Sequence, residues 1–363
     1  MNLKKIGISL GLALFLSFFV FERTALAQEE AVKIDSVVAE GTTHAPANLE
    51  EKADPTKAIM EHIADSHDWH LWGHTSLHLP IILITDKGVE VFSSGKFEHG
   101  EKAYSGKYYT YKMIEQKIRV VNAEGEVDKD ASSHVYDFSI TKNVASIWIA
   151  VILLIVIFKS VASAYKKREG KAPSGFQSFM EPIILFVRDD IARPNIGYKY
   201  ARFMPLLLTI FFFVWFNNLL GLIPIFPGGA NVTGNIFMTF VLAMVTMLAT
   251  NFNGNKYYWK HILLPDVPWW LYPIMIPVEL IGVISKPFAL MIRLFANIQA
   301  GHIIVLSLIS LIFIFKSLAV APVSIAFVLF MDVLELLVAA LQAFIFTMLT
   351  ALFIGTAVEE HSH

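Results

Sequence analysis

Long apolar runs fill the second half of the chain, whereas the first part is mostly polar. Runs over residues 144–165, 201–223 and 236–251 carry few charges, and each approaches the ~20 residues that an α-helix needs to cross the hydrocarbon core of a bilayer. Every backbone polar group in lipid must find a partner within the protein, and helices satisfy this requirement locally. The pattern therefore predicts an all-α polytopic membrane protein in this region.

Two further apolar runs, 274–315 and 317–357, are about twice as long as one span needs. At about 1.5 Å per residue, each would extend about 60 Å as one helix, against a hydrocarbon core of about 30 Å. Neither run has a cluster of Gly, Pro or Asn at its middle that could form a turn. We expect five membrane-embedded helices after signal removal, of which the last two are long, steeply tilted and joined near Lys316.

The first 27 residues have the order of a secretory signal peptide, with two lysines, an apolar stretch over 6–21 and Ala-Leu-Ala at 25–27. The alternative is an uncleaved first span. Four basic side chains directly follow the first apolar run, namely Lys166, Lys167, Arg168 and Lys171. The positive-inside rule makes this end cytoplasmic. The N-terminus is then extracytoplasmic, the C-terminus is cytoplasmic, and the domain over 144–363 lies in the membrane.

The polar region over 28–143 predicts a small, mixed α/β, extracytoplasmic domain. We expect a helix over 55–74, then two strands within 78–97 on either side of a turn at 86–88. A zinc site is one reading of the dense histidines in this region, because three could share one helical face. Gly73 interrupts such a helix, so surface or packing roles and no bound metal are preferred for His62, His67, His70, His74 and His78.

An amphipathic helix is predicted between the first two spans, over about 174–193. Its apolar residues recur at helical spacing, with Gln177, Glu181 and Arg188 on the opposite side. Such a helix lies in the plane of a membrane surface. We expect it on the cytoplasmic surface, with a kink at Pro182.

Composition excludes several classes of function. The chain is 55% hydrophobic and 17% charged, which fits a membrane protein with one soluble part. A net charge of −2 gives no basic field for nucleic acid, and the absence of cysteine excludes disulfides and thiol catalysis. No nucleotide-binding or hydrolase motif occurs. We therefore expect neither a cofactor nor a catalytic site of the chain's own.

Arg293 stands in the middle of the apolar run over 274–315. A guanidinium keeps its proton at bilayer depth, at a cost of about 2.5–3.5 kcal/mol on insertion scales. A partner charge or water must offset that cost. An arginine in this position therefore marks a functional site.

Helical phase separates the polar side chains of this run into two sets. At about 100° per residue, Asn297 and Glu279 fall close to Arg293, whereas His302 points the opposite way. If the last two helices pack antiparallel, Gln342 lies near the level of Arg293, and Glu335 lies near that of His302. A histidine beside a buried glutamate suits a proton relay. A static ion pair is the alternative for these two residues.

Three polar side chains outside this pair admit further readings. Asn217 and Asn218 either bridge helices or hold water in a proton path, and the sequence favours neither reading. Asp332 lies within about 60° of Glu335 on the same helix. We include Asn218 and Asp332 among the candidate proton-path residues.

The motifs PVELIGVISKP at 277–287, RLFANIQAGH at 293–302 and LQAFIFTMLTALFIGTAVEEH at 341–361 resemble subunit a of F-type ATP synthases. That family is the membrane stator beside the rotating c-ring. The resemblance covers about residues 145–363 and includes LLGLIP at 219–224. It implies a subunit of the proton-transporting complex in a bacterial inner membrane, with c-ring and b-type peripheral stalk subunits as partners.

The resemblance also implies a role for each polar residue. Arg293 matches the essential arginine that faces the ring carboxylate, with Gln342 and Asn297 as its polar neighbours. His302 and Glu335 match the channel from outside, and Glu279 matches an acidic position toward the cytoplasm. Gly221 departs from the pattern, because some members carry an acidic residue there. The outer channel of this chain then depends more on Asn218, His302 and Glu335.

The implied mechanism has two offset half-channels with Arg293 as a barrier between them. Protons enter past His302 and Glu335, load the ring and leave past Glu279. The alternative is a secondary ion transporter or channel in which Arg293 is a counter-ion for the substrate; it predicts inverted repeats, and none is visible. Proton and sodium are not distinguished as the coupling ion, because the ion ligands lie mostly on the ring.

Overall fold

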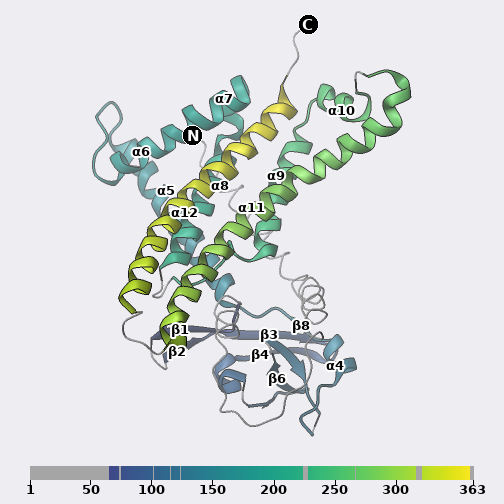
Figure 1. Cartoon of the computed structure of the whole chain (residues 1–363), viewed down its shortest axis with the longest axis vertical. Helices are drawn as coiled ribbons and strands as arrows, with labels where there is room; N and C mark the ends of the chain where they lie inside the picture. Colours follow the sequence, from purple (N-terminus) through teal and green to yellow (C-terminus); the bar gives the residue numbers. More distant parts are fainter. Residues whose placement is uncertain are drawn as a thin grey trace.

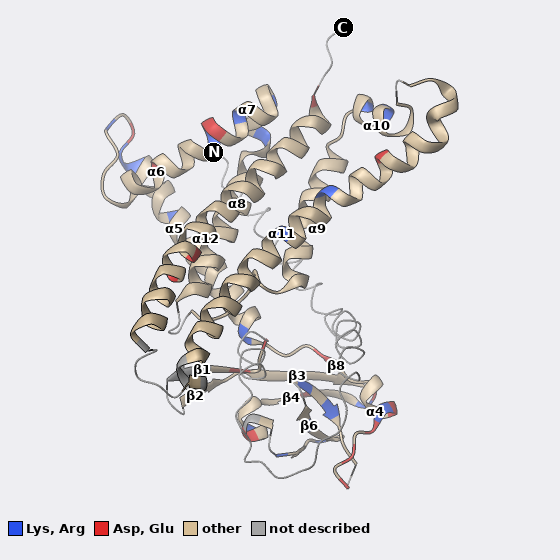
Figure 2. Ribbon diagram, viewed as in Figure 1, with Lys and Arg blue, Asp and Glu red and all other residues tan. Residues whose placement is uncertain are grey.

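The computed structural model describes residues 65–72, 75–100, 102–114, 116–122, 124–223, 228–265, 267–315 and 321–359. Two parts are visible in Figure 1, a β-rich domain and a bundle of helices that includes two very long ones. Figure 2 shows long stretches of the bundle without a charged residue, whereas charged side chains are frequent on the β-rich domain and near the far end of the bundle. The predicted signal peptide lies outside the described residues.

The β-rich domain contains three small antiparallel sheets, with strand orders β1-β2, β4-β3-β8 and β5-β6-β7. Its core is formed by large apolar side chains such as Ile81, Leu83, Phe97 and Tyr111. The elements are β1 Asp68–Trp72, β2 Thr75–His78, β3 Pro80–Thr85, β4 Gly88–Ser93, the 3₁₀ helix η2 Ser94–Gly100, β5 Tyr104–Ser105, β6 Thr110–Ile114, β7 Lys117–Val120, α4 Lys129–Ser133 and β8 Tyr136–Asp137.

The predicted pair of strands is present as the hairpin β3–β4, with Thr85 opposite Gly88. The predicted helix over 55–74 is wrong for residues 68–72, which form β1. This segment pairs with β2 through Trp69 opposite Leu77. Tertiary pairing thus overrides local helix propensity here. The residues before 65 lie outside the described part of the chain.

Two of the histidines pair with carboxylates. His67 is buried, and its Nε2 lies 3.3 Å from Oδ2 of Asp137, whereas Nδ1 of His78 lies 2.9 Å from Oδ1 of Asp68. Burial would raise the pKa of the Asp137 carboxyl, but its hydrogen bonds with His67 and Ser139 outweigh burial and hold that pKa below its ordinary value. The side chains of the other three histidines lie outside the described residues.

The helical part begins at residue 142, and its last two helices are the longest. The elements are α5 Lys142–Lys167, α6 Phe176–Phe186, the π-helix η3 Val187–Ala192, α7 Arg193–Ile196, the 3₁₀ helix η4 Gly197–Lys199, α8 Tyr200–Leu222, α9 Ile236–Phe252, α10 Lys256–Leu263, the 3₁₀ helix η5 Trp269–Leu271, α11 Tyr272–Phe315 and α12 Ala321–Val358.

The two long apolar runs are each one continuous helix, as predicted, with 44 residues in α11 and 38 in α12. They lie side by side and run in opposite directions (Figure 1). Four helical segments of the described chain are long and apolar enough to cross a membrane, and a fifth results if α9 and α10, bent by 104°, form one span. The steep tilt of the last two helices stays a prediction, and residues 316–320 lie outside the description.

The predicted amphipathic segment forms α6, η3 and α7, which follow one another without a loop and lead into α8. Its proline, Pro182, lies inside α6. Met180 and Ile191 are buried against the bundle, whereas Phe179 is exposed. The apolar face is therefore divided between the bundle and the surface, and the location at a membrane surface stays a prediction.

Candidate functional site

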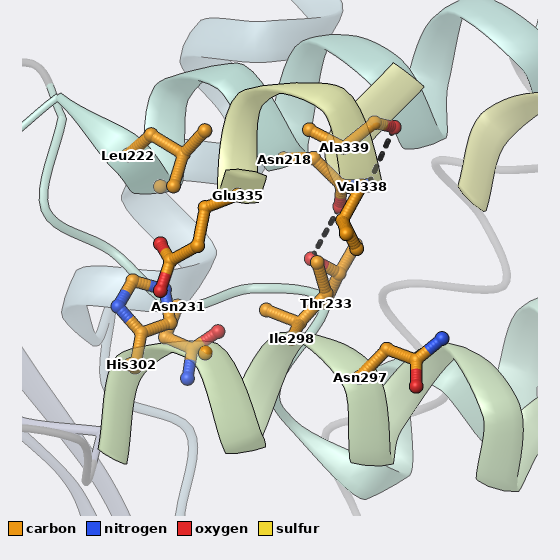
Figure 3. A pocket seen from close by; sticks show the side chains of 12 residues that line it. Asn218, Leu222, Asn231, Thr233, Asn297, Ile298, His302, Glu335, Val338 and Ala339 are labelled. Atoms are coloured by element: carbon orange, nitrogen blue, oxygen red, sulfur yellow. Dashed lines mark hydrogen bonds between the residues drawn. The ribbon is translucent and has the colours of Figure 1, made fainter. Parts of the chain in front are cut away.

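A polar cavity lies inside the bundle, between α8, α11, α12 and the loop over 228–235 (Figure 3). We call it the His302 cavity. Its volume of about 20 Å³ is enough for about one water molecule. It is lined by Asn218, Gly221, Leu222, Asn231, Thr233, Asn297, Ile298, Gly301, His302, Glu335, Val338 and Ala339.

His302 and Glu335 meet in this cavity from the two long helices. Figure 3 shows the carboxylate of Glu335 directed toward the imidazole of His302. Oε1 of Glu335 is buried and accepts no hydrogen bond from the described residues. A buried carboxylate oxygen without a donor is costly. A proton or a cavity water would satisfy it, so Glu335 suits the transient binding of a proton.

Gly301 is what allows the carboxylate to lie against α11. A Cβ atom built at Gly301 would lie 2.6 Å from Oε1 of Glu335. Contacts below about 3.0 Å do not occur for real Cβ atoms. Any other residue at 301 would therefore displace Glu335.

Asn218 joins three parts of the bundle in the wall of the cavity. Its side-chain amide donates to the carbonyl of Ala339 on α12 at 3.2 Å, and its Oδ1 accepts from the Thr233 hydroxyl at 2.6 Å (Figure 3). Asn218 therefore bridges helices and also faces the space where a water fits. Asn217 differs, because it donates to the carbonyl of Phe213 on its own helix.

The loop over 228–235 supplies the remaining wall. Asn231 donates from Nδ2 to Oε1 of Gln299 on α11 at 2.9 Å, and its Oδ1 accepts from the backbone N–H of Gly234. Sequence reasoning missed Asn231, Thr233 and Gln299. The loop is rich in Gly, Pro and Asn, a composition that predicts a turn but not which helix the turn packs against.

Arg293 lies outside the cavity and is exposed on α11, between the buried Leu290 and Leu294. Among the described residues, no carboxylate lies within ion-pair distance of it, and no hydrogen bond joins it to Gln342. Gln342 is buried in α12, and Asn297 lines one side of the His302 cavity. The structure thus unites His302, Glu335, Asn218 and Asn297, and leaves Arg293 and Gln342 apart.

The other two candidate carboxylates also lie outside this cavity. Asp332 is exposed on α12, and Glu279 is half-buried on α11. Glu279 lies close enough to Tyr258 on α10 to interact with it electrostatically. Asp332 is therefore on the same helix as Glu335 without sharing its pocket.

A second cavity of about 20 Å³ lies between α9, α10, α11 and α12, and we call it the Tyr258 cavity. The Tyr258 hydroxyl donates to Oδ1 of Asn251 at 2.9 Å, and the Lys286 ammonium lies 5.8 Å from the Phe353 ring. Tyr258, Asn251 and Lys286 all line it. Sequence reasoning missed this group, because its members come from separate helices with no shared spacing.

Comparison with known proteins adds two family matches. Residues 144–355 match the family profile described as ATP synthase A chain, and residues 58–138 match a domain of unknown function (DUF8433). The two matches meet near the boundary between the β-rich domain and α5. They divide the chain where the fold does.

Individual relatives give the same result. The chain is 48% identical over 233 residues to ATP synthase subunit a of Chloroherpeton thalassium, covering 63% of this chain and 69% of the relative. It is 50% identical to ATP synthase subunit a 2 of Chlorobaculum tepidum, covering 61% and 64%. It is 43% identical to ATP synthase subunit a of Pelodictyon phaeoclathratiforme, covering 73% and 79%.

Proposed function

Because this chain belongs to the ATP synthase A chain family, we propose that it is the proton-translocating stator subunit of an F-type ATP synthase. It is a multi-pass membrane protein and a component of that complex. We infer that it lies in a bacterial inner membrane, with its β-rich domain outside and its C-terminus in the cytoplasm. Its partners are then the c-ring, b-type peripheral stalk subunits and the rest of the complex.

The observation that carries the proposal is the meeting of His302 and Glu335 in a cavity with room for about one water. Both groups lie between apolar helices and close to the β-rich end of α11 and α12 (Figure 1). An imidazole and a carboxylate in contact with one water can pass a proton along hydrogen bonds. The His302 cavity is thus the outer half-channel, with Asn218 and Asn297 as its polar wall.

Arg293 acts as the barrier between the two half-channels. Its exposure on α11 without a described carboxylate partner fits a side chain whose counter-charge is on another protein. A fixed positive charge repels a proton and attracts a deprotonated ring carboxylate. The ring must therefore release its proton before that carboxylate passes Arg293, and Gln342 and Asn297 flank the path.

Protons leave through the opposite half-channel, past Glu279 and the Tyr258 cavity. Lys286 lines that cavity, and its charge disfavours a proton that would return. A membrane potential supplies about 2.3 kcal/mol per charge per 100 mV. Several protons must therefore pass for each ATP made elsewhere in the complex.

Substitution of Arg293 tests this function. In vesicles that contain the assembled complex, Arg293→Ala should abolish ATP-driven proton pumping, whereas Lys159→Ala, which removes an exposed cation of α5, should pump as the unchanged protein does. Normal pumping by Arg293→Ala would refute the barrier role. Ion flux through the purified chain without a ring protein would favour a secondary transporter instead.

A further inference from the structure

We propose that Trp69 of the β-rich domain is a positioning residue for the His302 cavity, because it fixes the loop that forms one cavity wall. The inference rests on the proposed function of that cavity as the outer half-channel. It assigns a task in proton uptake to the domain of unknown function matched at residues 58–138.

The contact joins residues from the two family matches. The indole Nε1–H of Trp69 donates to the carbonyl of Gly228 at 3.1 Å, and Trp69 is only 3% exposed. Its strand, β1, is held by pairing with β2. A buried hydrogen bond to a backbone carbonyl is expensive to lose, because the oxygen is then left without a donor.

Gly228 transmits this contact to the loop, because it is tightly packed. A Cβ atom at Gly228 would lie 2.2 Å from the carbonyl oxygen of Ile223 and 2.7 Å from that of Leu220. The next residue, Gly229, donates its N–H to the carbonyl of Leu220 at 3.2 Å. The first residues of the loop therefore cannot move without disturbing the end of α8.

The rest of the loop is irregular but buried. Ala230, Val232 and Thr233 are each 1% exposed. Asn231 then binds Gln299 on α11, and Thr233 binds Asn218 on α8. The carbonyl of Ala230 lies 3.3 Å from the place of a Cβ at Gly221, a position itself 4.0 Å from Nε2 of His302. A displacement at Gly228 would thus reach the surroundings of His302 within a few residues.

A second contact keeps the β-rich domain in place on the bundle. The backbone N–H of Lys142 donates to the carbonyl of Ser66 at 2.8 Å, and that of Asn143 donates to the Asp65 carboxylate at 3.1 Å. The segment before β1 is therefore attached to the start of α5. Trp69 lies three residues further along and reaches the loop from this fixed base.

Trp69→Phe tests the proposal, because it keeps a ring and removes the N–H donor. The matched control is Trp269→Phe, the same change at a side chain that is 82% exposed. Since the chain has no cysteine, Val232→Cys reports on the loop by its rate of reaction with a maleimide in the purified complex. Trp69→Phe should raise that rate about 3–10-fold, the factor for one lost hydrogen bond, and the control should not.

The functional readout is ATP synthesis driven by an imposed membrane potential, with the pH varied on the side of the β-rich domain. Trp69→Phe should lower the rate several-fold and displace its pH dependence, whereas reduced assembly alone would scale the rate equally at every pH. Unchanged labelling or an unchanged pH profile would overturn the role of Trp69, while the proposed function would stand. Normal pumping by Arg293→Ala would remove the proposed function itself.

Discussion

A Cβ atom at Gly301 on α11 would lie 2.6 Å from Oε1 of Glu335 on α12. The carboxylate therefore rests directly on the backbone of the neighbouring helix. This contact directs the carboxylate toward His302 (Figure 3). A small residue beside the histidine is thus as important for the geometry of the cavity as the histidine itself.

Gly301→Ala should displace the Glu335 carboxylate and slow proton uptake about tenfold or more, since small shifts of a reacting group can cost two orders of magnitude in rate. ATP synthesis in vesicles under an imposed potential measures the effect. Gly282→Ala in the same helix is the control, because a Cβ there meets nothing within 4 Å. Equal rates for the two variants would contradict the role of the contact.

Glu335→Gln keeps the shape of the side chain but removes its ability to bind and release a proton. We expect at least about a tenfold loss of proton flux, within the range for removal of an acid–base group. Asp332→Asn makes the comparable change at an exposed carboxylate outside the His302 cavity, and should cost much less. Flux at the wild-type level in Glu335→Gln would make Glu335 a structural residue.

Helical periodicity predicted the continuous long helices, and the phase of α11 predicted that His302 and Arg293 point apart. It could also pair His302 with Glu335, because both lie at similar distances from the turn between the helices. Contacts made by irregular segments were beyond it. Neither the fold of Asn231 and Thr233 against Gln299 and Asn218 nor the docking of Trp69 on Gly228 has a sequence period. For the same reason β1 was predicted as helix.

Asn218→Leu should lower the stability of the bundle, because it removes two buried hydrogen bonds and leaves the Thr233 hydroxyl without its acceptor. One buried group without a partner costs about 1–3 kcal/mol of the free energy of unfolding. Thermal inactivation of the purified complex measures this loss. Asn217→Leu is the contrast, since Asn217 makes one hydrogen bond within its own helix, and an equal loss there would argue against the bridging role of Asn218.

Acid should weaken the β-rich domain through Asp137. Hydrogen bonds with His67 and Ser139 outweigh burial and hold the pKa of its carboxyl below the ordinary value, so the ionised form favours the folded state. The stabilisation is present above the unfolded pKa of about 3.9 and is lost as the pH falls through the lower folded pKa. Asp137→Asn should remove it at neutral pH.

Hydrogen–deuterium exchange of residues 65–85 in the purified complex measures this effect, with the variants compared at each pH. The unchanged protein should be better protected than Asp137→Asn at pH 7, and the difference should shrink toward about pH 3. Asp130→Asn, at an exposed site of α4, should match the unchanged protein at both values. A difference that grew in acid would reverse the sign of the argument and exclude the ionised carboxylate as the stabilising form.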